Sequence, residues 1–537
     1  MDVMPQQPPE PVDSTKPPPD SPLDSLPEPA GTDPVPMDPA PLDPALIDPA
    51  PLDPASPAEL PPLSLRTTLR RAAMGVVAGA VLVTGAVVAV PEDEKKSAPP
   101  PAPGPVSRAL TASDMGYPAS LSDLTALIGD RQQWVGTHPA DAKSWARLGT
   151  AFVEWGQRSA DEAYFGRAEE ALKRSLNVVP GENGNTAAWV GLATLANARR
   201  DFALAKKWGE TVRVRQPKQW TVYPALIDAY NGLGDYTASR TAVERFAALR
   251  PGAAAILRTA RMYRDRGWHE NALASVQEAA DRATTPTQKA ECLHLLGELA
   301  WEQGEPEEAV AQYSAALRTD RDHYASLAGR AAALVALGRT DEAERDYKAA
   351  LAGLPRPEYL LELGELYDSL GRDEDARSQY AQLREALARG GNQGVDNALL
   401  RGRFEAAHGD PAVAVNVLNA EWARQHRSAA VADALGWALH LSGDSSGALP
   451  YATRAVAAEG QIASYAAHLG AIQQALKDYG PARRNLAEAL RINPHFSPLE
   501  GPAAKEALDS LGSPPAGGPQ DMAPAKPQPA APAPGRR

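Results

Sequence analysis

Residues 304–316 of the chain read GEPEEAVAQYSAA, and residues 338–350 read GRTDEAERDYKAA. Both stretches have alanine five residues after the glycine, tyrosine nine residues after it and a second alanine at twelve. The glycine-to-alanine spacing recurs in six pairs, whose glycines are 37, 34, 33, 38 and 34 residues apart: Gly267–Ala272, Gly304–Ala309, Gly338–Ala343, Gly371–Ala376, Gly409–Ala414 and Gly443–Ala448.

This period predicts an all-α solenoid of stacked helix pairs, because no single unit of this length can bury its apolar face alone. Each glycine is expected to end a first helix in the left-handed conformation. Each alanine is expected where two helices cross too closely for a larger side chain. Gly234 extends the series upstream, with Ser239 in place of the alanine.

Composition and charge narrow the class of protein. Hydrophobic residues make up 43% of the chain but aromatic residues only 6%, which favours close helix packing over a sheet core. The net charge is −13, and no basic stripe suited to nucleic acid is visible, so we expect no nucleic-acid partner. The single cysteine, Cys292, is expected to be a small buried apolar residue. The excess of arginine over lysine, with abundant Ala, Pro and Gly, predicts a GC-rich genome of the actinobacterial kind.

An acidic, proline-rich tail is predicted over residues 1–65, which contain 21 of the 51 prolines and have 12 acidic residues against one basic residue. Such a composition cannot bury enough apolar surface to fold, so we expect disorder. The tail is either a docking or spacer segment or an unselected low-complexity sequence.

A transmembrane signal-anchor helix is predicted over residues 66–90, because 19 uncharged residues run from Ala72 to Val90. A cleaved signal peptide is the alternative, although the preceding tail is too long for one. A buried core helix is the second alternative, although the predicted disorder on both sides leaves no folded part of the chain to cover such a helix. Gly75 and Gly79 have the spacing of a membrane helix-packing pair, which allows a homodimer, although such pairs are common in any Ala/Gly/Val-rich helix.

The remaining segments flank or form the array. We expect a Pro-rich linker over 91–117, an N-terminal capping helix over 118–140 with Ser120 as its cap, and about ten repeats over 141–495. A C-terminal capping helix is expected over 496–511, followed by a disordered Pro/Ala-rich tail over 512–537.

The repeated residues resemble the tetratricopeptide repeat family, whose units carry W-x2-L-G-x2-Y, then A-x3-F-x2-A, then P. The sixth unit offers Ala343, Tyr347, Ala350 and Pro355, and the eighth and ninth depart most, with Leu418 and Ala452 at the aromatic position. The resemblance implies that the first helices line a concave groove that holds peptides or partner surfaces. On those helices, eight candidate groove residues are Asn197, Asp228, Asn231, Arg261, Arg264, His294, Glu298 and Trp301.

In that groove the asparagines are expected to bond a peptide backbone, the two arginines to hold a carboxylate, and Trp301 to act as an apolar anchor. We expect reversal of both arginine charges to abolish binding and leave the fold intact. An ordinary solvated inner face without a ligand is the competing interpretation.

No sequence motif for catalysis, phosphate binding or metal binding is present: H-E-x-x-H, paired C-x-x-C and Gly-rich phosphate loops are all absent. We therefore expect no enzyme, no cofactor and no metal. The predicted function is a membrane-tethered scaffold for protein or peptide partners, and a chaperone-like assembly factor, as in cytochrome c maturation, is the alternative. An enzyme with an undetected groove site is the less favoured class. Arginines before the apolar run predict a single-pass protein of the cell membrane, with a cytoplasmic N-terminal tail and extracytoplasmic repeats.

Overall fold

The computed structural model describes residues 103–180, 185–459 and 461–512. This part of the chain holds 23 α-helices and no strand. The predicted tail over 1–65, the predicted membrane helix over 66–90 with Gly75 and Gly79, and the tail beyond Gly512 lie outside the described residues. None of the helices that are described is long and apolar enough to span a bilayer.

Two helices precede the array: α1 (Pro105–Met115) and α2 (Leu121–Thr137). Ser120 caps α2 as predicted, accepting a hydrogen bond from the Asp123 backbone N–H. The linker predicted over 91–117 is wrong for its second half, which forms α1. A proline in the first turn of a helix leaves no hydrogen bond unmade, and the Arg108 Nε donates to Asp123 Oδ2 at 3.1 Å, which holds α1 on α2.

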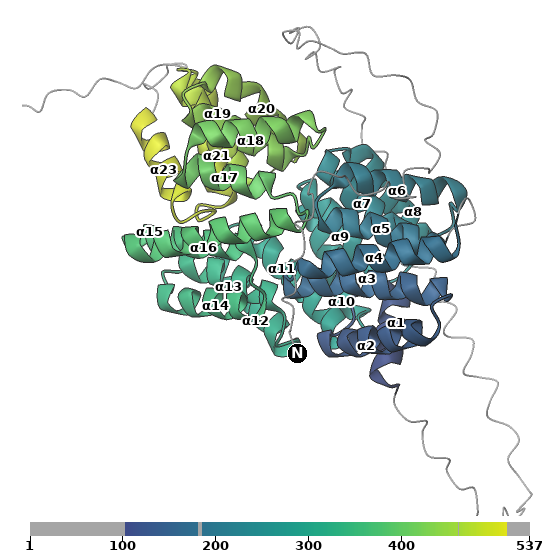
Figure 1. Ribbon diagram of the computed structural model, residues 1–537. Helices are drawn as coiled ribbons and strands as arrows, with labels where there is room; N and C mark the ends of the chain where they lie inside the picture. Colours follow the sequence, from purple (N-terminus) through teal and green to yellow (C-terminus); the bar gives the residue numbers. More distant parts are fainter. Residues whose placement is uncertain (1–102, 181–184, 460, 513–537) are drawn as a thin grey trace, which may run out of the picture. The chain divides into compact units, whose positions relative to one another are not determined.

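Ten helix pairs follow, from α3 to α22 (Figure 1). The first five pairs are α3 (Ala142–Ser159) and α4 (Ala163–Val178), α5 (Thr186–Ala198) and α6 (Phe202–Arg215), α7 (Val222–Leu233) and α8 (Tyr236–Leu249), α9 (Ala253–Asp265) and α10 (His269–Asp281), and α11 (Pro286–Glu302) and α12 (Pro306–Thr319).

The other five pairs are α13 (Tyr324–Ala336) and α14 (Thr340–Gly353), α15 (Pro357–Ser369) and α16 (Asp373–Asn392), α17 (Ala398–His408) and α18 (Pro411–Ala423), α19 (Ala429–Leu441) and α20 (Ser445–Ala458), and α21 (Ala463–Ala475) and α22 (Tyr479–Ile492). A final helix, α23 (Glu500–Leu511), follows the array. It starts four residues later than the predicted capping segment.

The residues that predicted the period have the expected roles. The six alanines of the recurring pairs are at most 1% exposed, so a larger side chain at these crossings would overlap its neighbours. Five of the six glycines have a positive φ, and Arg200 and Lys477 take the same left-handed position in the second and tenth pairs. Gly409 differs, because its φ is −137°. Cys292 is buried, 1% exposed, as predicted.

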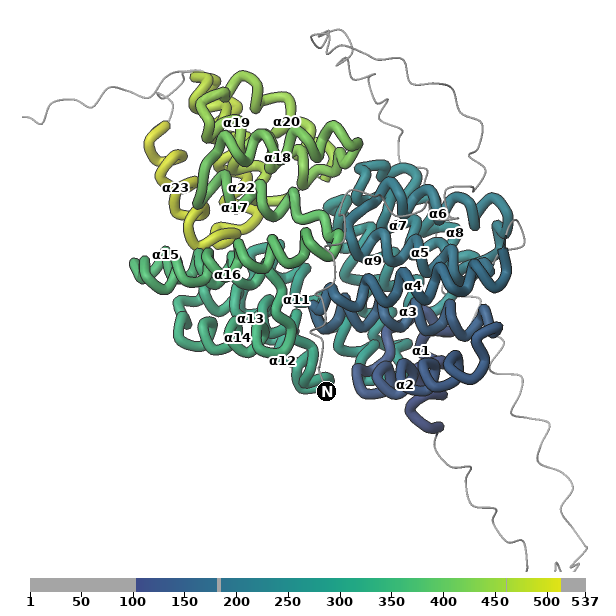
Figure 2. Tube along the Cα trace, viewed as in Figure 1, coloured from purple at the N-terminus to yellow at the C-terminus, as the bar shows by residue number. Residues whose placement is uncertain are grey.

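Units of the array that are far apart in sequence also contact one another (Figure 2). Intra-pair turns of early units meet the loops between late units, 192 to 197 residues further along the chain. Three hydrogen bonds mark these junctions: Arg200 Nη1 to Asn397 Oδ1 at 2.6 Å, Ala429 N to the Tyr236 hydroxyl at 2.8 Å, and Asn493 Nδ2 to the Trp301 carbonyl at 2.8 Å.

Candidate functional site

A cavity with a volume of about 1150 Å³ is lined by residues of α11, α13 and α15. Five aromatic side chains contribute to its lining: Trp301, Tyr313, Tyr347, Tyr359 and Phe496. A pocket of this size and aromatic content fits an extended peptide segment or a comparable organic group. We call it the central pocket.

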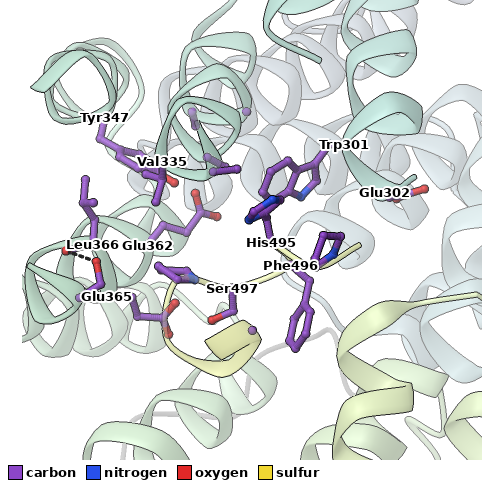
Figure 3. A pocket seen from close by; sticks show the side chains of 18 of the residues that line it. Trp301, Glu302, Val335, Tyr347, Glu362, Glu365, Leu366, His495, Phe496 and Ser497 are labelled. Carbon is purple, nitrogen blue, oxygen red and sulfur yellow. Dashed lines mark hydrogen bonds between the residues drawn. The ribbon is translucent and has the colours of Figure 1, made fainter. Parts of the chain in front are cut away.

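Its far wall comes from the other end of the chain. Residues 494–498 and α23 complete the central pocket, opposite α15, which carries Glu362 and Glu365 (Figure 3). The bond from Asn493 to the Trp301 carbonyl fixes this segment. Gly304 lets it approach, because a Cβ there would lie 3.0 Å from the Ile492 carbonyl oxygen, and its φ of +73° also favours glycine.

The central pocket is acidic. Its lining includes Glu298, Glu302, Glu362, Glu365 and Asp509, against Arg356 and Lys505 as the only lysine or arginine side chains among the lining residues described. Lys505 is already bonded to Asp509, at 2.5 Å. Glu298 and Glu302 face the Arg264 guanidinium, at 2.7 and 3.7 Å, and Glu365 Oε1 lies 3.2 Å from His408 Nε2. Of these lining acids, Glu362 is therefore the one without a described ion-pair partner.

Glu362 stands apart from the other acids because it occupies a repeat position that is usually small or apolar. Nine residues before the turn glycine, or its equivalent, the units from the second to the tenth carry Gly191, Ala225, Arg258, Leu295, Gly329, Glu362, Leu400, Ala434 and His468. Only three of these side chains ionise.

Two of those three ionisable residues have partners of opposite charge. Arg258 Nη1 lies 2.6 Å from Asp228 Oδ1, and His468 Nδ1 lies 2.9 Å from Asp433 Oδ1. No ion pair to Glu362 forms within the part of the chain that is described. An uncompensated carboxylate at a core position of a repeat is costly, so its presence in the wall of a cavity marks a candidate binding group.

The surroundings of Glu362 disfavour its charged form. Burial raises its pKa to about 8, and the neighbouring Glu365 and Glu358 carboxylates act in the same direction, against the hydrogen bond from the Tyr347 hydroxyl. Figure 3 places Glu362 facing the His495–Ser497 segment, whereas Glu302 lies to the side, beyond Trp301. Burial also raises the pKa of Glu302 to about 7, although the Arg264 guanidinium opposes the shift.

Three of the eight groove residues predicted from sequence, His294, Glu298 and Trp301, line the central pocket. Asn197 lines a separate cavity of about 210 Å³, and its Nδ2 donates to the Ala225 carbonyl at 2.8 Å. The others line a third cavity of about 220 Å³: Asp228, Asn231, Arg261 and Arg264. The structure therefore does not bring the predicted set together in one site.

From the sequence, Arg261 and Arg264 were expected to hold a ligand carboxylate. In the structure both are already paired with glutamates of the protein. Arg261 Nη2 lies 3.0 Å from Glu291 Oε2, and Arg264 Nη1 lies 2.7 Å from Glu298 Oε2. Arg264 also lies 3.7 Å from Glu302. Replacing Arg264 by glutamate would place a third carboxylate beside Glu298 and Glu302 in a partly buried site. The expectation that reversing both arginine charges leaves the fold intact is therefore contradicted.

Glu362 and Glu365 were not among the residues predicted from sequence, although the repeat register contained a signal for both. Glu365 lies 67 residues after Glu298, as Gly371 lies 67 residues after Gly304, so the two glutamates are equivalent. Phe496 and its neighbours gave no such signal, because their place in the wall depends on a contact across the array.

The Ser326 side chain lies between two histidines, an arrangement that in an enzyme can activate a serine nucleophile. The Ser326 hydroxyl lies 3.1 Å from His294 Nδ1 and 2.9 Å from His323 Nδ1. Ser326 is 0% exposed and is not part of the pocket lining, so its oxygen has no path to a substrate. Burial lowers the pKa of His294 to about 4. We interpret the three residues as a packing contact between α11 and α13.

Among the residues described, one group of side chains converges as metal ligands would: Asp396, Glu421 and His426 have ligand atoms within 4.8 Å of one another. The Arg424 guanidinium bonds both carboxylates, and the Glu421 carboxylate also bonds His426. The protein thus supplies its own cation to these acids.

Comparison with known proteins gives the same repeat type. The tetratricopeptide repeat family model matches residues 294–356 and 329–392. No curated protein matches the sequence. A thermophilic tetratricopeptide repeat protein of Thermus thermophilus is similar over 36% of this chain and 99% of its own, with 22% identity and a TM-score of 0.32.

Two further solved structures are similar at low identity. PilF of Pseudomonas aeruginosa is similar over 37% of this chain and 90% of its own, with 18% identity and a TM-score of 0.31. Human IFIT1, in a dimer with PPP-AAAA, is similar over 65% of this chain and 81% of its own, with 15% identity and a TM-score of 0.39. Likenesses at this level carry no functional argument. The family match and the helix pairs together identify tetratricopeptide repeats within residues 294–392 of this chain.

Proposed function

We propose that the protein is a non-catalytic scaffold that binds a partner protein by a segment carrying a lysine or arginine, held in the central pocket beside Glu362. Helical repeats of this type are suited to protein interactions. The observation that carries the proposal is the carboxyl group of Glu362, which lines a 1150 Å³ pocket and has no ion-pair partner among the described residues. A bound cationic side chain would lower the raised pKa of Glu362, so that the carboxyl group ionises and pairs with it. The aromatic side chains would pack on the methylene groups of that cation.

Proximity labelling in intact cells tests this proposal. Glu362→Gln keeps the side-chain volume and the acceptor for Tyr347 but cannot ionise when a cation binds beside it, so it should lose the labelled partners of the wild-type protein. Glu385→Gln is the matched control, because the Glu385 side chain is 75% exposed on α16, outside the pocket lining. An unchanged set of labelled proteins with Glu362→Gln would place partner binding elsewhere.

We also propose that the apolar run from Ala72 to Val90 anchors the scaffold as a single-pass helix, with the repeats outside the cytoplasm. The arginines before the run and the acids Glu92 to Glu94 after it support this orientation. A phosphatase reporter fused after residue 515 should be active only when exported. Fluorescence of a cytoplasm-dependent reporter at that position would invert the topology.

A further inference from the structure

We propose that residues 513–537 of this same chain dock into the central pocket and occupy it until a partner displaces them. The inference rests on the proposed function in one respect, that the central pocket accepts a cationic segment. It adds the identity of one occupant and a means of regulating access. We call residues 513–537 the C-terminal segment.

The attachment point places the C-terminal segment at the pocket. One face of α23 lines the pocket, ending with Leu508 and Asp509. The Arg483 side chain then holds the end of this helix, since its Nη2 donates to the Leu511 carbonyl at 2.8 Å and its Nε donates to the Gly512 carbonyl at 3.2 Å. The chain therefore leaves the described structure at a fixed point beside the pocket wall.

Charge distinguishes the C-terminal segment from the other end of the chain. It carries three basic residues, Lys526, Arg536 and Arg537, and one acidic residue, Asp521. Residues 1–65 carry 12 acidic residues and one basic residue. An acidic pocket attracts the first and repels the second, so the two proline-rich segments are not equivalent candidates.

Proline content matches the aromatic lining. Eight of the 25 residues in the C-terminal segment are proline. Such a sequence favours the extended polyproline conformation, which loses little entropy when it binds and which aromatic-lined grooves recognise. The aromatic side chains and the glutamates of the central pocket thus suit the two dominant residue types of the segment.

The length is sufficient for return to the pocket. Lys526 lies 14 residues beyond Gly512 and Arg536 lies 24 beyond it, which spans about 43 Å and about 74 Å at ~3.1 Å per residue. A tether of this length gives an effective concentration on the order of 1 mM. An intramolecular contact of only ~0.1 mM affinity would therefore keep the pocket about tenfold less accessible to a competitor.

A peptide competition on the full chain, solubilised in detergent, tests the inference. The probe is a fluorescent peptide of residues 513–537. The proteins are the wild type and a variant with Lys526→Glu, Arg536→Glu and Arg537→Glu. The variant should bind the probe about tenfold more tightly, because its own segment no longer competes. Adding Glu362→Gln to the variant should weaken binding again, whereas adding Glu385→Gln should not.

Equal affinity of the probe for the wild type and the charge-reversed variant would overturn the inference, as would failure of the probe to bind either protein. The two proposals fail separately. Loss of labelled partners with Glu362→Gln alongside equal probe affinities leaves the scaffold function and removes self-occupancy. A tenfold probe difference alongside unchanged labelled partners supports self-occupancy and moves the partner site elsewhere.

Discussion

The substitution Glu362→Gln should make the fold more stable at neutral and alkaline pH but not at acid pH. Glu362 takes a position that is Leu295 in the fifth unit and Gly329 in the sixth, and no described cation neutralises it. Glutamine keeps the shape and the acceptor for Tyr347 and removes the ionisable proton. The comparison therefore isolates the free energy of charging this one carboxyl group in the folded state.

The magnitude follows from the pKa of Glu362, which burial raises from 4.5 to about 8. Below pH 4.5 the group is neutral in both folded and unfolded states, so it contributes no pH dependence. Between 4.5 and 8 the folded state retains a proton that the unfolded state has released, so the free energy of unfolding falls as pH rises. At about 1.36 kcal/mol for each pH unit, the loss is on the order of 3 kcal/mol at pH 7 and at most about 5 kcal/mol above pH 8.

Urea unfolding followed by circular dichroism at pH 5, 7 and 8.5 measures this effect. The stability difference between Glu362→Gln and the wild type should be small at pH 5 and should grow to several kcal/mol at pH 8.5. Glu302 titrates in the same range, with a pKa of about 7, but it is present in both proteins and cancels in the difference. A difference that stays constant over this range would refute the claim that Glu362 is protonated in the fold.

Three further substitutions test the packing. Ala343→Trp should destabilise the array by roughly 1–3 kcal/mol or more, because Ala343 is 0% exposed at a helix crossing, and coincident thermal melts would contradict this. Arg200→Gly keeps the left-handed backbone, φ 60°, but removes the side-chain bond to Asn397, so hydrogen exchange should quicken at the Asp396 amide, which donates to the Arg199 carbonyl at 2.9 Å; unchanged exchange would show that the side-chain contact is not needed. Arg264→Glu should lower the melting temperature, since Arg264 is paired with two glutamates, and a wild-type melt would show that these ion pairs contribute little.

The repeat fold could be predicted because its determinants are local and recur. The turn glycine and the crossing alanine each depend on neighbours within one unit, so a spacing in sequence maps directly to a contact. The segment that forms α1 was mistaken for linker because prolines before it dominate the local composition. This helix also makes tertiary contacts that no propensity rule contains, the burial of Ala109 in the core and the ion pair of Arg108 with Asp123.

The site was only partly predictable for a related reason. Trp301, His294 and Glu298 follow from the register of first-helix positions, and Glu365 follows from extending that register by two units. The opposite wall, with Phe496, does not follow, because contacts between residues nearly 200 positions apart leave no periodic trace. The pairing of Arg264 with glutamates of the next unit also escaped, since sequence alone does not show which charges meet.

The location of the central pocket depends on the length of the array. The three bridging bonds span 192, 193 and 197 residues, which is between five and six units of the 34-residue step. Because the separation is nearly constant, each of these contacts joins one unit to the loop that follows the unit five further along. The loop after the tenth unit thus meets the turn of the fifth. An array shorter by two units would keep α11, α13 and α15 but would lack the segment that faces Glu362. The enclosure that raises the pKa of that carboxyl is therefore a property of the whole array and not of the units that carry the acids.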